Sequence, residues 1–243
     1  MASITLPWLD SPKDFPTTGQ ALLEPAGLLA ASDHLTVDWL LQSYPRGIFP
    51  WYSPGEPVLW WSTNPRAVLY VEEFKLHRSL LKAIRKQAAD PSREIRLNHA
   101  FEATIRACAG HPRAGQQGTW ITEHIIQAYL DLHRLGHAHS IEHWHNGALV
   151  GGLYCVAFGR MVFGESMFAR ETDASKVAFA YFVSWLKRQN VRIIDCQQAT
   201  HHLLSLGARL LERKVFEEEM AHSISMSALN WEPCTLAWTN DPT

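Results

Sequence analysis

The chain lacks a long charge-free apolar run and an excess of basic charge. The longest such run, residues 177–186, is too short to cross a bilayer, and no basic start followed by an apolar segment opens the sequence. We therefore expect a cytoplasmic protein without a membrane span. The 22 lysines and arginines against 24 aspartates and glutamates give a net charge of -2, which excludes a polybasic protein that coats DNA or acidic membranes.

Paired cysteines and nucleotide-binding loops are also missing. Four cysteines, at positions 108, 155, 196 and 234, lie far apart without a Cys-x-x-Cys pair, so we expect free thiols and neither a thiolate zinc site nor a disulfide scaffold. No glycine-rich phosphate loop follows a predicted strand. Five histidines crowd residues 133–145, but Gly136 separates the one pair with helical metal-site spacing. We expect no metal and no nucleotide cofactor.

The composition divides the chain into two parts. Residues 1–66 are rich in proline and aromatic side chains and predict a small N-terminal domain, in which a short helix starts after Thr36 and ends before Pro45. Residues 67–243 carry longer periodic segments and predict a second domain.

Within the second part, apolar periodicity and turn residues predict an α+β fold. Asn146-Gly147 and Gly159-Arg160 are turn signals between three strands of an antiparallel meander. We predict strands at 67–71, 138–145, 148–158, 161–168, 191–197 and 208–215, and helices at 75–88, 122–136, 173–188, 200–206 and 216–223. This order resembles that of N-acetyltransferase-type (GNAT-type) acyltransferases, which implies a central mixed, mostly antiparallel sheet flanked by helices. Residues 169–173 lack the glycine-rich turn that would bind coenzyme A.

Three polar residues stand out in strands that are otherwise apolar. Strand alternation places Glu165 in a row with Met161, Phe163 and Met167, where a bare charge would cost several kcal/mol. Asp195 and Gln197 share a face at the end of another buried strand, so they could act on one ligand. The structural alternatives are a glutamate bonded to backbone groups and an aspartate that caps the next helix.

A basic helix and several tryptophans are residues that could bind a single-stranded end of a nucleic acid. The cations of the helix lie on one flank and could neutralise phosphates, although a solvated helix face explains them equally well. Trp51 and Trp120 could stack on single-stranded bases, whereas Trp60 and Trp61 are expected to fill a core. The cations are Arg78, Lys82, Arg85 and Lys86.

Nine short strings give the sequence a family resemblance. The strings are Glu24–Leu29, Arg46–Trp51, Trp60–Ser62, Pro65–Leu69, Gly118–Thr122, Gly136–Glu142, Gly164–Phe168, Ala174–Lys176 and Ile194–Gln197. With them the sequence is similar to the leucyl/phenylalanyl-tRNA protein transferases, bacterial enzymes that move Leu or Phe from tRNA onto the N-terminus of proteins. The resemblance covers residues 24 to about 208.

The resemblance implies a site as well as an activity. Carried over by position, the active centre is Glu165, Asp195 and Gln197, Trp51 and Trp120 bind the terminal adenosine of tRNA, and the four cations of the basic helix bind its phosphates. The resemblance also implies Leu-tRNA and Phe-tRNA as donors, with Met used less well, and acceptor proteins that begin with Arg or Lys and are thereby marked for N-degron degradation. The implied pocket for the transferred side chain is Leu153, Val162, Phe179, Phe182, Leu186 and Ile194.

The resemblance further implies how the reaction proceeds. The ester is already activated, so the enzyme must supply proximity and a neutral amine, and it needs no cofactor. We expect Gln197 to accept a hydrogen bond from the acceptor amine, Asp195 to polarise Gln197, and Glu165 to orient the amine. A monomer is the default expectation.

Three departures from the family pattern bear on donor preference rather than on the reaction class. Thr63-Asn64 stands where Pro-Asp is expected, Cys155 replaces a glycine, and residues 198–201 differ from the usual run. Two other functions stay open at this point: a tRNA-dependent ligase of the same fold that acts on a peptidoglycan precursor, and a non-catalytic module that shelters the aminoacyl ester.

Overall fold

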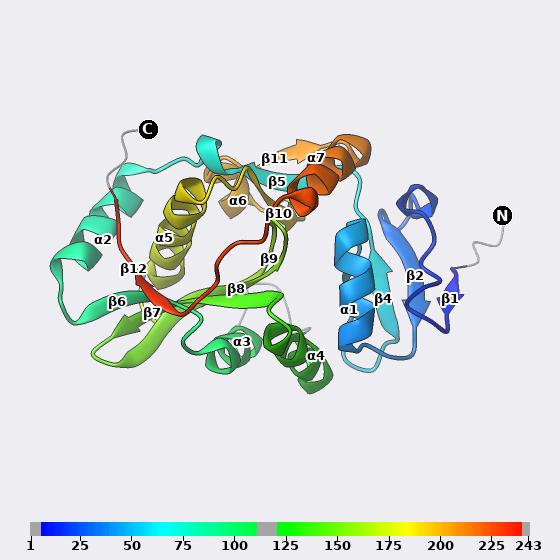
Figure 1. The fold of residues 1–243 in the computed structure, drawn as a ribbon, viewed down its shortest axis with the longest axis horizontal. Coiled ribbons are helices and arrows are strands. Elements are labelled where there is room, and N and C mark those ends of the chain that lie inside the picture. Colours follow the sequence, from blue (N-terminus) through cyan, green and yellow to red (C-terminus); the bar gives the residue numbers. More distant parts are fainter. Residues whose placement is uncertain (1–5, 111–120, 240–243) are drawn as a thin grey trace.

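A computed structural model describes residues 6–110 and 121–239, which fold around two β-sheets (Figure 1). The smaller sheet lies at one end of the molecule and has the order β1-β2-β4-β3. The helix α1 (Val37–Ser43) packs beside it, and a 3-10 turn at Tyr44–Arg46 follows directly. The strands are β1 (Trp8–Leu9), β2 (Leu28–Ser32), β3 (Phe49–Pro50) and β4 (Val58–Trp61).

The larger sheet has eight strands in the order β11-β5-β10-β9-β8-β7-β6-β12. Every neighbouring pair is antiparallel except β10 and β9, which are parallel, so the predicted mixed and mostly antiparallel sheet is confirmed. The strands are β5 (Arg66–Tyr70), β6 (Arg93–Leu97), β7 (Ala138–His145), β8 (Ala148–Phe158), β9 (Met161–Ala169), β10 (Ile193–Gln197), β11 (Arg209–Leu211) and β12 (Cys234–Leu236).

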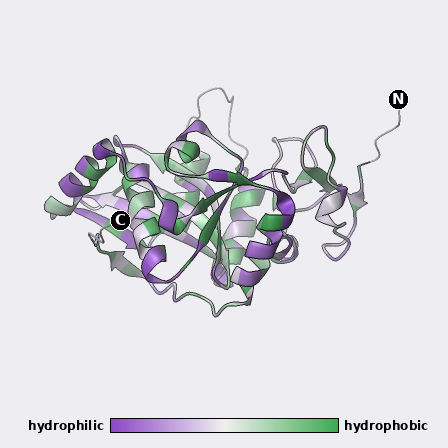
Figure 2. Cartoon of the chain, turned by 90° about the horizontal axis from the view of Figure 1, so that it is seen from above, coloured by the Kyte–Doolittle hydropathy of each residue, from purple (hydrophilic) through white to green (hydrophobic). Residues whose placement is uncertain are grey.

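Helices cover both faces of the larger sheet. The core under α3, α4 and α7 contains the inward side chains of one face, and the core under α2, α5 and α6 contains those of the other. Figure 2 shows hydrophilic and hydrophobic stretches alternating along the helices, as amphipathic packing requires. No helix in the described ranges is long and apolar enough to span a membrane. The helices are α2 (Arg78–Ala89), α3 (Phe101–Ala109), α4 (Glu123–Arg134), α5 (Ala174–Arg188), α6 (His201–Ser205) and α7 (Arg213–Ser225).

The first of these cores, the α4-side core, continues into the small sheet. Trp39 and Trp60 stack with ring centroids 5.5 Å apart and belong to the same buried cluster as Tyr129 and Phe163. Trp60 and Trp61 are buried, as predicted. Because one apolar cluster reaches across both sheets, the division into 1–66 and 67–243 stays a prediction about folding units.

Several predicted boundaries are wrong by a few residues. The amphipathic helix begins at Arg78 rather than at residue 75, because residues 71–73 form a 3-10 turn first. The predicted strand at 208–215 is short, since β11 ends at Leu211 and α7 already begins at Arg213.

Candidate active site

A cavity of about 450 Å³ lies where β9 and β10 part. The two strands pair at Ile194 with Val162 and at Asp195 with Phe163, and beyond these pairs their residues line the cavity instead. Phe49, Pro50 and Trp51 of the small sheet close one side. The remaining lining residues are Leu153, Tyr154, Gly164, Glu165, Ser166, Met167, Phe179, Ile194, Cys196, Gln197, Gln198, Thr200, His202 and Leu203.

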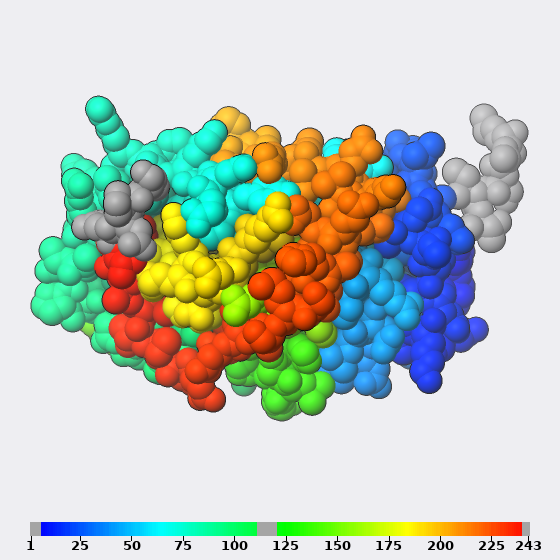
Figure 3. Space-filling model, turned by 45° about the horizontal axis from the view of Figure 1, so that its top comes forward, coloured from blue at the N-terminus to red at the C-terminus, as the bar shows by residue number. Residues whose placement is uncertain are grey.

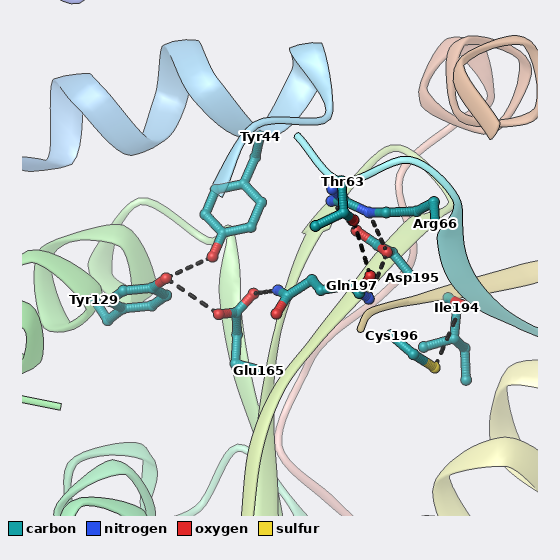
Figure 4. Close-up of polar contacts among 9 residues, drawn as sticks. All are labelled: Tyr44, Thr63, Arg66, Tyr129, Glu165, Ile194, Asp195, Cys196 and Gln197. Carbon is teal, nitrogen blue, oxygen red and sulfur yellow. Dashed lines mark hydrogen bonds and ion pairs between the residues drawn. The ribbon is translucent and has the colours of Figure 1, made fainter. Parts of the chain in front are cut away.

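A chain of hydrogen bonds leads from the α4-side core to the cavity (Figure 4). The hydroxyls of Tyr44 and Tyr129 lie 2.5 Å apart, and the Tyr129 hydroxyl donates to Oε2 of Glu165 at 3.2 Å. The Nε2 of Gln197 donates to Oε1 of the same carboxyl at 3.1 Å. Sequence reasoning missed both tyrosines, because their positions 85 residues apart carry no local signal. Through these two tyrosines, the 3-10 turn after α1 and the helix α4 are connected to Glu165 in the cavity.

Glu165 is poised to exchange a proton near neutral pH. Burial raises its pKa to about 7, although hydrogen bonds from the hydroxyls of Tyr44 and Tyr129 act in the opposite direction. Burial, and then the charge of Glu165, raise the pKa of both tyrosines well above the ordinary value, so the phenols stay protonated donors. A carboxyl with such a pKa in a cavity is a typical acid–base group.

Strand β9 contains a bulge at Glu165. Gly164 is opposite Cys155 while Ser166 is opposite Tyr154, so Glu165 is an extra residue in the ladder. The predicted simple alternation is therefore wrong beyond this point: Met161 and Phe163 enter the α4-side core, but Met167 packs against the core on the other face. Glu165 contacts Tyr129 on the same side as Phe163, as alternation predicts, and the bulge changes the faces of the residues that follow it.

Asp195 does not reach the cavity. Its carboxylate is fully buried and accepts two hydrogen bonds from Arg66, from Nε at 2.9 Å and from Nη2 at 2.6 Å. The rings of Phe49 and Phe216 lie 4.7 and 4.8 Å from the guanidinium carbon. We expected Asp195 and Gln197 to face one ligand, but only Gln197 lines the cavity, because the Asp195 carboxylate is paired with the buried Arg66 guanidinium.

Asp195 instead holds the backbone of Gln197. Its Oδ1 accepts the Gln197 N–H at 2.8 Å, so the contact is with the backbone and not with the carboxamide that we expected it to polarise. Gln197 has a φ of 60°, and the Gln198 N–H donates to the Cys196 carbonyl at 2.6 Å, which makes a γ-turn centred on Gln197. Thr63, from the segment before β5, donates to the Gln197 carbonyl at 3.1 Å. Strained turns of this kind are commonly found at functional sites.

The predicted side-chain pocket is one packed cluster, and half of it faces the cavity. Leu153, Phe179 and Ile194 line the cavity wall. Val162, Phe182 and Leu186 are fully buried in the same core. Met167, Cys196 and Leu203 complete the apolar wall, which sequence reasoning missed because a bulge and a short helix present them. Burial, and then the charge of Asp195, raise the pKa of the Cys196 thiol, so it is not a nucleophile at neutral pH.

The structure describes five of the six residues that we predicted to bind tRNA. Trp51 is half-buried and lines the cavity, and its ring centroid lies 5.5 Å from that of Trp61. Trp120 lies outside the described residues. Arg78, Lys82, Arg85 and Lys86 are all exposed on α2, whose start is tied to α6 by a 2.7 Å contact between His77 Nε2 and the Ser205 carbonyl. Since α6 supplies His202 and Leu203 to the cavity, the basic helix starts beside it.

Three of the five crowded histidines pack on aromatic rings. His133 stacks on Phe101 at 4.3 Å, His137 on Phe158 at 4.3 Å and His139 on Trp231 at 3.8 Å between ring centroids. Among residues 6–110 and 121–239, no three histidine, cysteine, aspartate or glutamate side chains are grouped as a metal site requires.

The cavity has a polar wall and an apolar wall. A carboxyl with a pKa of about 7 and a carboxamide lie on one side, and an apolar wall lies on the other. Such a site can hold an apolar acyl group while a neighbouring amine loses a proton. Together with the mixed sheet, it defines an acyltransferase class of protein.

Comparison with known proteins gives the family. The family model described as "Leucyl/phenylalanyl-tRNA protein transferase" matches residues 68–221, and the model of its N-terminal domain matches residues 33–64. A leucyl/phenylalanyl-tRNA–protein transferase of Polaromonas sp. is 52% identical over 236 residues, covering 96% of this chain and 92% of the relative. One of Burkholderia ambifaria is 51% identical over 231 residues, covering 93% and 91%. The chain belongs to the leucyl/phenylalanyl-tRNA protein transferase family and is an aminoacyltransferase.

Two solved structures are similar to this chain at much lower sequence identity. L-PGS from Bacillus licheniformis has a TM-score of 0.42 and 11% identity, covering 85% of this chain and 65% of that one. A GCN5-related N-acetyltransferase from Kribbella flavida has a TM-score of 0.36 and 10% identity, covering 69% and 58%.

Proposed function

We propose that this protein transfers Leu or Phe, and Met less well, from the 3′ end of tRNA to the α-amino group of proteins that begin with Arg or Lys. Family membership together with a cavity that is apolar on one wall and carries Glu165 and Gln197 on the other is the observation that supports it. The product would mark its carrier for N-degron degradation in the cytoplasm, and the enzyme would act as a monomer.

The donor ester would lie between the two walls of the cavity. Its amino-acid side chain would bury against Leu153, Phe179 and Ile194, which favours apolar donors. Trp51 would stack on the terminal adenine, with Trp120 as its partner from outside the described residues. The four cations of α2 would track the phosphates that lead away from the cavity.

Gln197 and Glu165 would prepare the attacking amine. Because Nε2 of Gln197 donates to Glu165, its Oε1 is turned to accept a hydrogen bond from the amine. An α-ammonium has a pKa of about 8, only about one unit above that of Glu165, so transfer of its proton to the carboxylate costs little. The neutral amine then forms the N–C bond and the ester C–O bond breaks. Nitrogen loses two protons in all: the one held by Glu165 ends on the ribose oxygen, and the one lost as the amide forms passes to solvent.

Arg66 and Asp195 would act as positioning residues. They touch neither substrate, but they hold the backbone N–H of Gln197 and thereby aim its carboxamide. A cationic acceptor also suits the cavity, since Glu165 is the only acidic side chain among the described residues that line it, and an approaching positive charge stabilises the carboxylate.

The test is transfer of label from [¹⁴C]Leu-tRNA to a peptide that begins with Arg. We expect incorporation into this peptide and none into the same peptide with an acetylated N-terminus. A matched peptide that begins with Asp should accept little. Release of leucine without incorporation, or transfer to a peptidoglycan precursor instead, would overturn the proposal.

A further inference from the structure

Gly164 is a cavity residue that the backbone does not require to be glycine. A Cβ built on it would meet two atoms within 4 Å, the Asp195 carbonyl oxygen at 3.5 Å and Cγ2 of Ile194 at 3.8 Å. Both are ordinary van der Waals separations. Its φ is not in the left-handed region where glycine is favoured.

Other glycines of the same sheet are different. A Cβ on Gly151 would lie 2.5 Å from Cβ of Ala174, and a Cβ on Gly152 would lie 2.5 Å from the Ile141 carbonyl oxygen. Close packing therefore requires glycine at those two positions of β8. At Gly164 a side chain would fit the backbone, although glycine weakens a strand interior relative to alanine. The empty volume beside Gly164 is therefore the feature to be explained.

That empty volume faces the apolar wall of the cavity. Val162, two residues earlier and before the bulge, enters the core that also holds Leu153, Phe179 and Ile194, so strand alternation directs Gly164 to the same side. The cross-strand partner of Gly164 is Cys155, whose side chain is fully buried in that core. A glycine in a strand commonly marks the place where a ligand approaches the backbone closely.

We propose that Gly164 sets the largest side chain that the cavity accepts from the donor, so that the space above its Cα is filled by the outer part of a phenylalanine ring. This inference rests on the proposed function. Leucine, which is shorter, fills less of this space, and a methyl group at position 164 excludes phenylalanine much more than leucine. Gly164 is a specificity-determining residue and takes no part in proton transfer.

The test compares donors in Gly164→Ala. With Leu-tRNA and Phe-tRNA and an Arg-initial peptide, the ratio of kcat/KM for Leu to that for Phe should rise about 10-fold or more, the discrimination that one methylene in a tight pocket provides. The kcat/KM for Leu should change by less than about 3-fold on the same scale. Gly19→Ala is the matched control, because a Cβ there has nothing within 4 Å, and its ratio should equal that of the unsubstituted protein.

A second variant tests the same claim in the opposite direction. Cys155→Gly removes bulk from the cross-strand neighbour, so the Leu-to-Phe ratio should fall, and this result decides the question if Gly164→Ala does not fold. An unchanged ratio in a folded Gly164→Ala, or equal losses for both donors, would overturn the inference alone. Absence of any transfer by the unsubstituted protein would instead overturn the proposed function, and the inference with it.

Discussion

The proton of Glu165 gives the first prediction at the scale of single residues. With a carboxyl pKa of about 7, the ionised form rises through neutral pH, so transfer should accelerate between about pH 6 and 8. In Glu165→Gln this rise of the rate between pH 6 and 8 should disappear, and turnover should fall about 10²–10⁴-fold. The rate should then rise only near pH 8, where the acceptor amine loses its proton. Initial rates of peptide labelling across pH 5.5–9 measure both. An unchanged profile in the variant would assign this rise to another group.

The same substitution has a stability effect of definite sign. The folded-state pKa of Glu165 is above the ordinary value of 4.5, so the folded protein binds this proton more tightly than the unfolded chain does. Glu165 thus destabilises the fold progressively as pH rises from about 4.5 to about 7. Urea midpoints of Glu165→Gln should equal those of the unsubstituted protein at pH 4 and exceed them at pH 8.

Asp195 gives a prediction that separates folding from function. Asp195→Ala leaves Arg66 charged, unpaired and only 1% exposed, which should destabilise the protein by about 3–5 kcal/mol. Turnover should fall far more than donor binding, because Gln197 loses the acceptor of its backbone N–H. Chemical unfolding and single-turnover labelling measure the two effects.

The double variant Arg66→Met with Asp195→Leu is the matched control. Two apolar side chains of similar volume can replace a buried ion pair without loss of stability. We expect it to regain most of the fold's stability but not the turnover. Full recovery of both would show that Asp195 acts only on stability.

Residue types alone could indicate Glu165 and Gln197 but not what Asp195 does. A carboxylate in an apolar strand is visible in a sequence. The pairing of Asp195 with Arg66, 129 residues away, is not, because it depends on the contact between β5 and β10. The family resemblance supplied the positions of all three residues. Only the structure shows that Asp195 accepts a hydrogen bond from the backbone N–H of Gln197.

At the scale of elements, helix α4 affects the pKa of Glu165 on strand β9. The Tyr129 hydroxyl, from α4, donates to the Glu165 carboxylate and so lowers its pKa relative to burial alone. In Tyr129→Phe the pKa of Glu165 should rise above 7, which moves the rising limb of the rate to higher pH. The pH profile of labelling tests this, and a limb that moves to lower pH would contradict the geometry.

The exposed face of α2 gives a prediction about binding rather than chemistry. None of Arg78, Lys82, Arg85 and Lys86 forms an ion pair with another described residue. Changing all four to Gln should raise KM for aminoacyl-tRNA, leave kcat nearly unchanged and reduce the salt dependence of binding by about 0.7–0.9 per lost phosphate contact. Lys13→Gln, at an exposed lysine of the small sheet's segment, is the control. An unaltered salt slope would place the tRNA elsewhere.

Elements with strong local signals were predicted closely, and those without were missed. The meander strands agree with prediction to within one residue, and α4 begins where the Thr122 hydroxyl accepts the Ile125 N–H. In contrast, β6 and α3 were not predicted: β6 reads Arg-Glu-Ile-Arg-Leu, and it becomes a strand because β7 and β12 pair with it on either side. The bulges in β9 and β10, at Glu165 and next to Gln197, carry no sequence signal of their own.

At the scale of the whole molecule, α7 connects the small sheet to the rest (Figure 3). At its start, the Arg213 guanidinium donates to the carbonyls of Thr18 and Ser62, at 2.7 and 2.8 Å, and the Arg213 N–H donates to Asn64 Oδ1 at 3.0 Å. Its apolar face places Phe216 and Met220 in the cluster that contains Trp39 and Trp60. The wall of the cavity that Trp51 forms is therefore held against the wall that Glu165 forms.

Such continuity predicts one cooperative unfolding transition, although the sequence divides at residue 66. Trp60 of the four-stranded sheet and Trp39 of α1 belong to the α4-side core, so exposing one part exposes apolar surface of the other. Pulsed hydrogen exchange in graded urea, read by mass spectrometry, should give one midpoint for β2 and β4 and for β8 and β9. Two midpoints separated by more than the experimental error would mean that residues 1–66 open independently. The cavity would then lose the wall that carries Trp51 before the larger sheet unfolds, and tRNA binding would fall before the sheet's hydrogen bonds exchange.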